Sequence, residues 1–382
     1  MKGPLTGPLS GLRIVESTAF IAAPLATMSL AQLGAEVIRL DPPEGGLDYH
    51  RWPLAPSGAS LYWAMLNRGK QSVTLDLRDA QGRQAAADMI CDGDGDGNTG
   101  GGIFVTNLPT RDVLTPQALL ERRPDAIVVT LDGSPDGASA IDYTVHAACG
   151  AAMMTGPENH IGPMGNAVPF WDVIAGRTLA MGILAAELDR LRTGNGQHVA
   201  LSLSDIAMET MANVGILAET ELAGHPRPRQ GNAIYGSFGG DFATRCGRWF
   251  IVVAVTRKQW RALVAATGLE AEMASVSDDL DEEHARFHHQ AQIGAHLSAW
   301  AARHDLDQIG QAFAGTAVCW SAYRDTAQML AEDPRASETN ALFDRLAHPG
   351  VAPVLTPRSP LRLSNHPGLA ARSAPILGGK PE

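Results

Sequence analysis

Asp172 is the acidic residue whose surroundings most suggest chemistry. It is the only carboxylate in the largely apolar segment VPFWDVIAGR, 168–177. Aspartate is a preferred N-cap residue of helices, where its side chain accepts a backbone N–H. A carboxylate can also attack an acyl group as a nucleophile. Both interpretations are open, and the segment alone favours capping of a helix over 172–192.

Arg68 and Lys70 form a second group, because they place two positive charges in one short turn. They lie in LNRGKQSVTLDL, 66–77, just before an expected strand. Such residues are often ordinary surface charges, but an arginine and a lysine can also bind the phosphates of a cofactor. The residues alone leave both interpretations open.

The sequence gives little support to metal or serine-hydrolase chemistry. His50, His146 and His160 lie in expected loops or turns and are interpreted as structural. There is no H-x-x-H or H-E-x-x-H pattern, so no metal is expected, and there is no G-x-S-x-G turn. The loop 91–102 begins like a calcium loop, but Ile103 replaces the closing glutamate, so a surface insertion is predicted.

The composition is that of a compact α/β protein. The 382 residues are 45% hydrophobic and 19% charged, and this length favours two domains. The net charge of −11 argues against a nucleic-acid partner, because such proteins attract phosphates with a basic surface. No apolar run is long enough to span a membrane, no secretory signal is evident, and the four cysteines form no C-x-x-C pair. A cytoplasmic protein is therefore expected.

Strand-like and helix-like segments alternate over the first half of the chain. This alternation predicts a doubly wound parallel sheet with helices on both faces. The first strand–helix turn contains no G-x-G-x-x-G, which argues against a nicotinamide dinucleotide. The expected strands are 12–16, 36–41, 72–77, 102–107, 126–131 and 198–204, and the expected helices include 23–35, 78–90, 116–122, 172–192 and one capped by Ser204.

The segment HPRPRQGNAIYGSFGGDF, 225–242, is interpreted as a linker into a smaller α/β unit. That unit is predicted to contain a strand at 249–255 and helices at 257–266 and 284–303. The sequence after it becomes rich in proline and glycine, as expected for a segment that returns to the first domain. The predicted domains are 1–224 (large), 225–325 (small, with linkers) and 326–382 (the returning C-terminal segment).

These segments occur in an order that resembles the class III CoA-transferase family, which also contains the α-methylacyl-CoA racemases. The resemblance covers nearly the whole chain, and its most specific blocks are NRGK at 67–70 and D-V-x-A-G followed by T-G-x-G-Q within 172–197. It implies a large Rossmann-like domain and a smaller α/β domain, in two subunits interlocked as a homodimer. The segments GGLDYHRWP and RPRQGNAIYGSFGGDF resemble the subgroup that moves CoA within mesaconyl-CoA.

The resemblance also implies an activity. The family's aspartate nucleophile falls on Asp172, and the implied substrate is the CoA thioester of a small dicarboxylic acid, with no metal. In the subgroup, CoA moves between the C1 and C4 carboxyls through an aspartyl mixed anhydride and an enzyme–CoA thioester. The rival interpretations are an intermolecular CoA-transferase for another dicarboxylic acid, a racemase, and a CoA-binding protein without catalysis. Ser139 stands where racemases have histidine, and the nearby His146 lies at a different position.

The resemblance finally places residues around CoA and the acid. Ile21 stands where relatives have glutamine, so backbone N–H groups near Ala22 are expected to stabilise the oxyanion. Thr115 stands where an arginine is expected. The implied CoA contacts are Ile21, Ala22, Arg39, Arg68, Lys70 and Asn107. The implied contacts with the acid are Arg51, Tyr143, Arg229, Gly236 and Gly239, the last two in a glycine-rich loop expected to cover the site.

Overall fold

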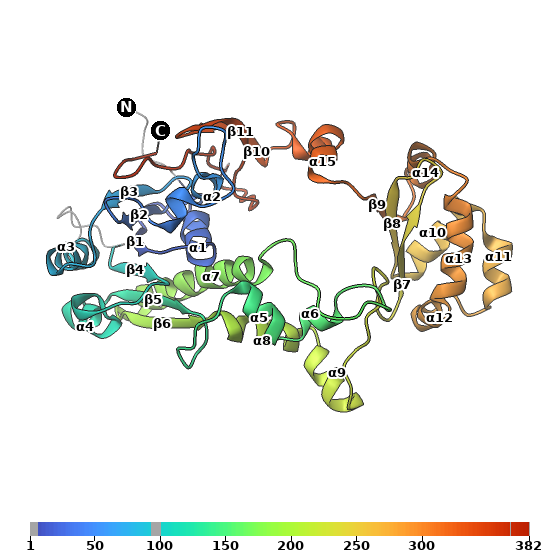
Figure 1. Cartoon of the computed structure of the whole chain (residues 1–382), viewed down its shortest axis with the longest axis horizontal. Coiled ribbons are helices and arrows are strands. Elements are labelled where there is room, and N and C mark those ends of the chain that lie inside the picture. The colour runs from blue at the N-terminus through green and yellow to red at the C-terminus, as the bar shows by residue number, and fades with distance from the viewer. Residues whose placement is uncertain (1–6, 93–100, 367, 382) are drawn as a thin grey trace. The chain divides into compact units, whose positions relative to one another are not determined.

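The chain forms two units, each with its own hydrophobic core. A computed structural model describes residues 7–92, 101–366 and 368–381 (Figure 1). Contacts within the chain assign Met1–Cys149, Asn166–Ala218 and Pro334–Glu382 to the first unit, and Gly150–Gly165 and Glu219–Asp333 to the second. The first unit is therefore discontinuous in sequence. The predicted ranges 1–224, 225–325 and 326–382 stay a prediction.

A six-stranded parallel sheet is the centre of the first unit. Its order is β3-β2-β1-β4-β5-β6, and every neighbouring pair is parallel. This order reverses between β1 and β4, as in dinucleotide-binding folds, and confirms the predicted doubly wound α/β class. The strands are β1 (Arg13–Ser17), β2 (Glu36–Asp41), β3 (Gln71–Thr74), β4 (Ile103–Thr106), β5 (Ile127–Asp132) and β6 (Gln197–Ser202).

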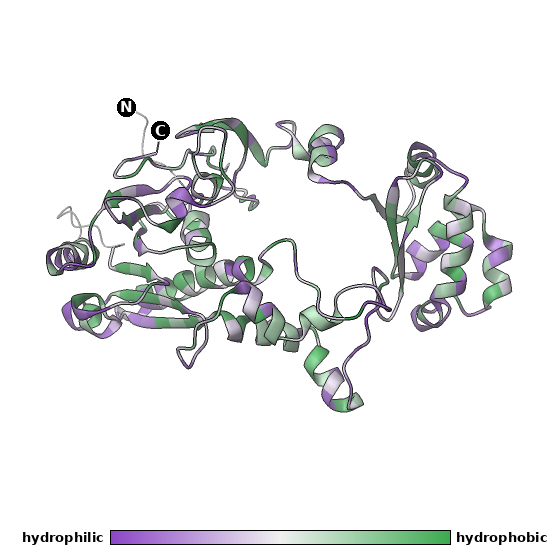
Figure 2. Cartoon of the chain, viewed as in Figure 1, coloured by the Kyte–Doolittle hydropathy of each residue, from purple (hydrophilic) through white to green (hydrophobic). Residues whose placement is uncertain are grey.

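Helices cover both faces of the sheet. Successive side chains of a strand point to opposite faces, so strands that are apolar throughout need a helix layer on each side. On one face, α3 (Ala80–Cys91) and α4 (Pro116–Arg122) share a buried cluster with β1, β2, β4 and β5. On the other face, α1 (Ala22–Ala31) packs against α7 (Phe170–Thr193), which also contacts β5 and β6. Figure 2 shows the central strand β4 in the hydrophobic colour, as burial on both faces requires. The unit also contains α2 (Leu61–Leu66), α5 (Asp142–Ala148) and α8 (Leu203–Asn213).

The end of the chain packs against the edge strand of this sheet. After the hairpin of β10 (Phe343–His348) and β11 (Val351–Pro357), the chain runs beside β3. The backbone N–H of Ser72 donates to the carbonyl of Gly379 at 2.8 Å. The indole N–H of Trp63 donates to the carbonyl of Pro375 at 2.9 Å. The last residues are therefore part of the first unit.

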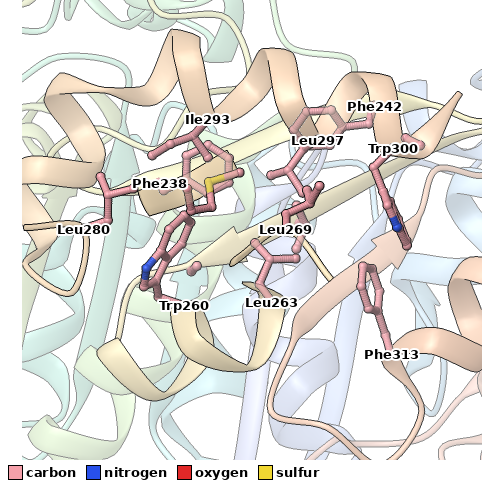
Figure 3. Close-up of a cluster of buried hydrophobic side chains, with 14 of the residues drawn as sticks. Phe238, Phe242, Trp260, Leu263, Leu269, Leu280, Ile293, Leu297, Trp300 and Phe313 are labelled. Atoms are coloured by element: carbon pink, nitrogen blue, oxygen red, sulfur yellow. The ribbon is translucent and has the colours of Figure 1, made fainter. Parts of the chain in front are cut away.

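The second unit is a three-stranded antiparallel sheet covered by helices. Its strands, β7 (Phe238–Ala243), β8 (Trp249–Ala254) and β9 (Cys319–Ala322), pair in the order β7-β8-β9. Phenylalanine, tryptophan and leucine side chains from the sheet and the helices fill one core (Figure 3). The helices are α6 (Ala151–Met154), α10 (Arg257–Thr267), α11 (Glu270–Val276), α12 (Glu283–His288), α13 (Gln290–Ala301), α14 (Leu306–Phe313) and α15 (Thr326–Glu332), while α9 (Ile216–Ala223) spans the boundary between the units.

Some details differ from the sequence predictions. Helix α8 is capped by Ser202, whose hydroxyl accepts the N–H of Asp205, so the prediction of Ser204 as the cap is wrong. The predicted helix at 284–303 is broken at His289 into α12 and α13. Most of the 91–102 insertion lies outside the described residues. No helix in the described ranges is both long and apolar enough to span a bilayer. The interlocked homodimer stays a prediction.

The closest approach of α1 and α7 gives a test of the packing. A Cβ added at Gly176 would lie 2.7 Å from the carbonyl oxygen of Ala22, so Gly176→Ala must push the two helices apart. We expect a lower melting temperature, corresponding to about 1–3 kcal/mol, from overpacking. The matched control is Gly182→Ala in the same helix, where the nearest atom is 3.4 Å away. That variant should be neutral or stabilised by up to about 1 kcal/mol, because alanine favours helix over glycine. Equal melting temperatures for the two variants would contradict the described packing.

Candidate active site

Asp172 is not the N-cap of its helix. Helix α7 begins at Phe170, so Asp172 lies in its first turn, and the preceding Pro169 offers no side-chain cap. The cap is instead Asp142, at the start of α5, whose Oδ2 accepts the N–H of Trp171 at 2.8 Å and of Asp172 at 3.1 Å. The predicted capping role of Asp172 is therefore wrong. Because another carboxylate satisfies the helix terminus, the Asp172 side chain has no structural task there.

The surroundings of Asp172 make it unusually basic for an aspartate. Its half-buried position raises the pKa to about 6, mainly because burial disfavours the charged form. The neighbouring charge of Asp142 raises the pKa further, while the positive charge of Arg51 lowers it. The carboxylate is therefore mostly ionised near neutral pH, and it is a stronger base than an exposed aspartate. A perturbed carboxyl of this kind marks a candidate functional group.

Trp171 and His146 fix the junction between α5 and α7. The indole N–H of Trp171 donates to Nδ1 of the buried His146 at 3.2 Å, and Nδ2 of Asn166 lies 3.2 Å from the same nitrogen. Because an indole nitrogen can only donate, Nδ1 must accept, which puts the hydrogen of a neutral ring on Nε2. His146 therefore holds the residue next to Asp172 in place. This contact supports the structural interpretation of His146.

The turn between β1 and α1 lies close to the first turns of α7. Asp172 and Gly176 are four residues apart on one helix face, and Gly176 packs against the carbonyl of Ala22. Phe20 adopts φ +68°, a left-handed conformation unfavourable for a side-chain-bearing residue. Its N–H donates to both carboxylate oxygens of Asp48, at 2.9 and 3.0 Å, which holds this conformation.

The same turn presents backbone donors. The side chain of Asn107 accepts the N–H of Ala19 and donates to its carbonyl, each at 2.8 Å. At the start of α1, the N–H groups of Ala22 and Ala23 have no acceptor within the described residues. Unsatisfied N–H groups at a helix start favour an anion or a developing oxyanion. The arrangement is compatible with the predicted roles of Ile21 and Ala22.

A pocket of about 510 Å³ opens at the carboxyl ends of β1, β2 and β4. Doubly wound sheets bind ligands at this point, where the strand order reverses. Ser17, Asp41 and Thr106, the last residues of the three strands, line the pocket together with Ala19 of the β1–α1 turn. Its cationic lining residues are Arg39, Arg78, Arg83 and Arg111.

The basic residues that the resemblance assigns to CoA mostly donate their hydrogen bonds to oxygens of the protein. Lys70 is fully buried, and its ammonium donates to Glu16 at 2.7 Å and to Pro24 and Asn67 at 3.0 Å each. With its three donors used, Lys70 is a structural cation, and burial lowers its pKa to about 8. The predicted contact of Lys70 with CoA would require one of these donors to change partner, and it stays a prediction.

Arg68 and Arg39 are also held by the protein. The Arg68 side chain donates to the carbonyls of Met65 and Pro357, facing the C-terminal hairpin, and its predicted contact with CoA stays a prediction. Arg39 bonds Asp41 at 2.7 Å and the carbonyl of Thr18 at 2.8 Å. Arg39 nevertheless lines the pocket, which leaves its predicted role open.

Sequence reasoning missed several residues of this region. Thr115, where an arginine is expected, caps α4 by accepting the N–H of Ala118, so its type has a local structural reason. Arg78, Arg83 and Arg111 line the pocket from other elements and were not predicted. No short motif marks these arginines, because the fold brings them together from the turn before α3, from α3 itself and from the loop after β4. Asp142 is adjacent to the predicted Tyr143, whose side chain is largely exposed.

Three of the predicted substrate residues belong to the second unit. Arg229 donates to the carbonyls of Gly162 and Ala152 within that unit. Gly236 has φ +78° in a turn, whereas Gly239 lies inside β7 and pairs with Val253. The expected glycine-rich loop is thus partly a strand, which corrects the prediction for Gly239. Contacts of these residues with substrate stay predictions.

Comparison with known proteins identifies the family. The model of CoA-transferase family III matches residues 9–380. The chain belongs to CoA-transferase family III. Within this family, it is 41% identical over 379 residues to 2-methylfumaryl-CoA isomerase of Chloroflexus aurantiacus, which covers 98% of this chain and 92% of the relative. The membership predicted from the sequence is confirmed, and the family implies a CoA thioester as substrate.

A more distant relative and a solved structure are also similar to this chain. The chain is 27% identical to succinyl-CoA–D-citramalate CoA-transferase of Chloroflexus aurantiacus, over 79% of this chain and 75% of that one. A CAIB/BAIF family protein from Brucella suis superposes with a TM-score of 0.79 at 23% identity, over 97% of both chains. Across the described ranges, no group of three or more His, Cys, Asp or Glu side chains is arranged for a metal ion.

The structural role of Lys70 can be tested by thermal unfolding. Lys70→Met leaves the buried Glu16 without its nearest cation, and removing one partner of a buried pair costs about 3–5 kcal/mol. The double variant Glu16→Gln/Lys70→Met removes the uncompensated charge and should recover part of that loss. A single variant that melts like the wild type but binds CoA more weakly would contradict the structural role and support the cofactor contact.

The influence of Asp142 on Asp172 can be measured by titration. Asp142→Asn keeps an oxygen that can cap α7 but removes the charge, so the pKa of Asp172 should fall below about 6. Carboxyl ¹³C NMR measures this pKa, with the Asp172 signal assigned by its loss in Asp172→Asn. The control, Asp189→Asn, lies about 25 Å further along the same helix and should leave the pKa unchanged. An unchanged pKa in Asp142→Asn would show that the charge of Asp142 does not reach Asp172.

Proposed function

We propose that this protein is a 2-methylfumaryl-CoA isomerase, which moves CoA between the C1 and C4 carboxyls of mesaconyl-CoA within one active site. The observation that carries the proposal is the 41% identity to such an isomerase over nearly the whole of both chains. A basic, half-buried carboxylate in α7, a helix that packs against the start of α1 with its unsatisfied N–H donors, supports the chemistry that this reaction needs. The family membership alone supports the coarser function, transfer of CoA between carboxylic acids.

Asp172 is the proposed nucleophile. Its carboxylate attacks the C1 thioester carbonyl; a C–O bond forms, the C–S bond breaks, and CoA leaves as the thiolate. The product is a mixed anhydride between Asp172 and the acid. The N–H groups of Ala22 and Ala23, which have no acceptor within the described residues, are the proposed donors to the oxyanion of the tetrahedral intermediate. The raised pKa of Asp172 favours this step, because a more basic carboxylate is a better nucleophile.

The CoA thiolate then attacks the acyl carbon of Asp172. This attack forms an enzyme–CoA thioester and releases mesaconate as a dicarboxylate. The C4 carboxylate of mesaconate attacks the thioester, which expels the thiolate and forms a second anhydride. Attack of the thiolate on C4 completes the transfer and restores the Asp172 carboxylate. No second substrate is consumed, so the free acid must stay in the site, where its effective concentration is high.

The pocket at the strand ends is the proposed site for the nucleotide part of CoA. Arg39, Arg78, Arg83 and Arg111 offer cations to its phosphates. Arg78 binds Asp76 at an exposed position, where an ion pair is weak enough to exchange for phosphate, whereas Arg83 is largely buried and pairs with the exposed Asp112. The β1–α1 turn lies between this pocket and the start of α7, so the thioester end is proposed to pass over that turn.

A racemase is less compatible with the site. Racemisation needs a second acid–base group opposite the aspartate to exchange the proton at the α-carbon. His146 is buried, and its Nδ1 accepts the indole N–H of Trp171. An intermolecular transfer to another dicarboxylic acid uses the same groups and differs only in whether the released acid leaves.

The decisive assay incubates the protein with C1-mesaconyl-CoA without added acid and follows the C4 isomer by chromatography. We expect isomerisation that falls as the pH drops below about 6, because Asp172 reacts only as the carboxylate. Asp172→Ala should lower the rate at least about a thousandfold, because it removes the nucleophile. Mass spectrometry of the wild type should find CoA attached at Asp172.

Asp189→Asn, in the same helix, is the control for the substitution and should keep its activity. Absence of the C4 isomer with folded protein would refute the isomerase. Formation of the isomer only when a dicarboxylic acid is added would indicate intermolecular transfer. Full turnover by Asp172→Ala would refute the proposed nucleophile.

A further inference from the structure

Arg51 carries a guanidinium group that has aromatic neighbours but no acceptor. The residue is half-buried and follows the 3-10 turn Leu47–His50. Its guanidinium carbon lies 4.9 Å from the ring centre of Phe20 and 5.0 Å from that of Tyr62. Throughout the described ranges, no oxygen accepts a hydrogen bond from this guanidinium, and no carboxylate forms an ion pair with it.

Free donors are unusual for an arginine in this part of the fold. Arg39 and Arg68 direct their donors to oxygens of the protein. A guanidinium has five N–H donors, and those removed from water need acceptors. Stacking on aromatic rings satisfies the planar faces but leaves the donors at the edge available. The two rings and the held Phe20 backbone therefore fix the position of Arg51 without using its hydrogen-bonding capacity.

Arg51 also lies near Asp172 without binding it. Its charge lowers the pKa of Asp172 and of Asp48, so both carboxylates are within electrostatic reach. Asp48 is already occupied, because it accepts the N–H of Phe20 and contacts Arg39. Arg51 and Asp172 form no ion pair within the described residues, so the guanidinium keeps its donors for another anion near the carboxylate.

We propose that Arg51 binds the carboxylate of a dicarboxylic acid that is not reacting at Asp172. This inference rests on the proposed function and assigns its substrate class, a short dicarboxylate. While C1 is joined to CoA or to Asp172, the C4 carboxylate accepts hydrogen bonds from the guanidinium of Arg51. After the acid has turned, the C1 carboxylate takes that place. A planar guanidinium matches a carboxylate with two parallel hydrogen bonds, which suits either end of the acid.

This role explains how the free acid is retained. Mesaconate released from the anhydride has no covalent bond to the enzyme, and its two charges favour departure into water. A fixed cation near Asp172 counters that tendency. The same cation provides specificity, because an acyl group without a second carboxylate leaves Arg51 without its acceptor.

The test compares binding of two CoA thioesters by Asp172→Asn, which has no nucleophile. Mesaconyl-CoA carries a free carboxylate and crotonyl-CoA does not, while the CoA part anchors both. We expect Asp172→Asn to prefer mesaconyl-CoA by at least about tenfold, as expected for a hydrogen-bonded charge pair. Adding Arg51→Met should abolish the preference, and adding Arg51→Lys should leave part of it. Isothermal titration calorimetry measures the six affinities and their differences.

Arg192→Met is the matched control, because Arg192 is exposed in the last turn of α7. It should keep the full preference. Tyr62→Leu retains the charge but removes one ring, and should weaken the preference partially. The melting temperature of Arg51→Met should stay near that of its parent, because no hydrogen bond within the described structure is lost. A preference that survives Arg51→Met, or is absent from Asp172→Asn, overturns the proposal.

The binding test separates this inference from the proposed function, because it requires no turnover. If the wild type does not isomerise mesaconyl-CoA and the Arg51-dependent preference is present, the isomerase is refuted and the carboxylate site stands. If the wild type isomerises and the preference does not depend on Arg51, the reaction stands and the site must be sought elsewhere.

Discussion

The buried ion network around Glu16 is the constraint on which the first unit depends. Glu16 lies on the central strand β1 and binds Lys70 from the NRGK turn, Thr27 from α1 and Arg39 from β2. Charges removed from water must be paired, so these four elements can assemble in only one arrangement. The network therefore fixes the carboxyl ends of β1 and β2, where the pocket opens. The most recognisable basic motif of the chain serves the scaffold, and cations for a ligand come from less conspicuous segments.

The pKa of Asp172 is set by opposing influences of the surrounding protein. Burial and Asp142 make the carboxylate basic, while Arg51 keeps it sufficiently ionised. Capping by Asp142 leaves the reactive side chain free of the helix terminus. In the proposed cycle the Asp172 carboxylate attacks once and leaves once, and such a balance suits both steps, because neither its free nor its acylated form is strongly favoured.

The sequence was sufficient to predict whatever depends on local pattern. Alternating apolar segments gave the strands and helices of the sheet, and the D-V-x-A-G block led to Asp172. The cap of α7 could not be predicted, because Asp142 lies thirty residues before Asp172 and only the fold brings the two together. The burial of Lys70 could not be predicted from the sequence either, since a charged residue in a turn that contains glycine usually faces water. The left-handed Phe20 and the strand position of Gly239 likewise depend on tertiary contacts that no short pattern encodes.

The discontinuous first unit has a consequence for synthesis of the chain. Its sheet is complete by Ser202, but its final packing needs the residues after Pro334, including the carbonyl of Gly379 beside β3. A ribosome adds residues from the N-terminus, so the second unit emerges whole while the first still lacks its closing segment. The edge of β3 must remain exposed until residues 378 and 379 have been synthesised. A stop codon just before these residues would thus leave an open sheet edge, which is a site for aggregation.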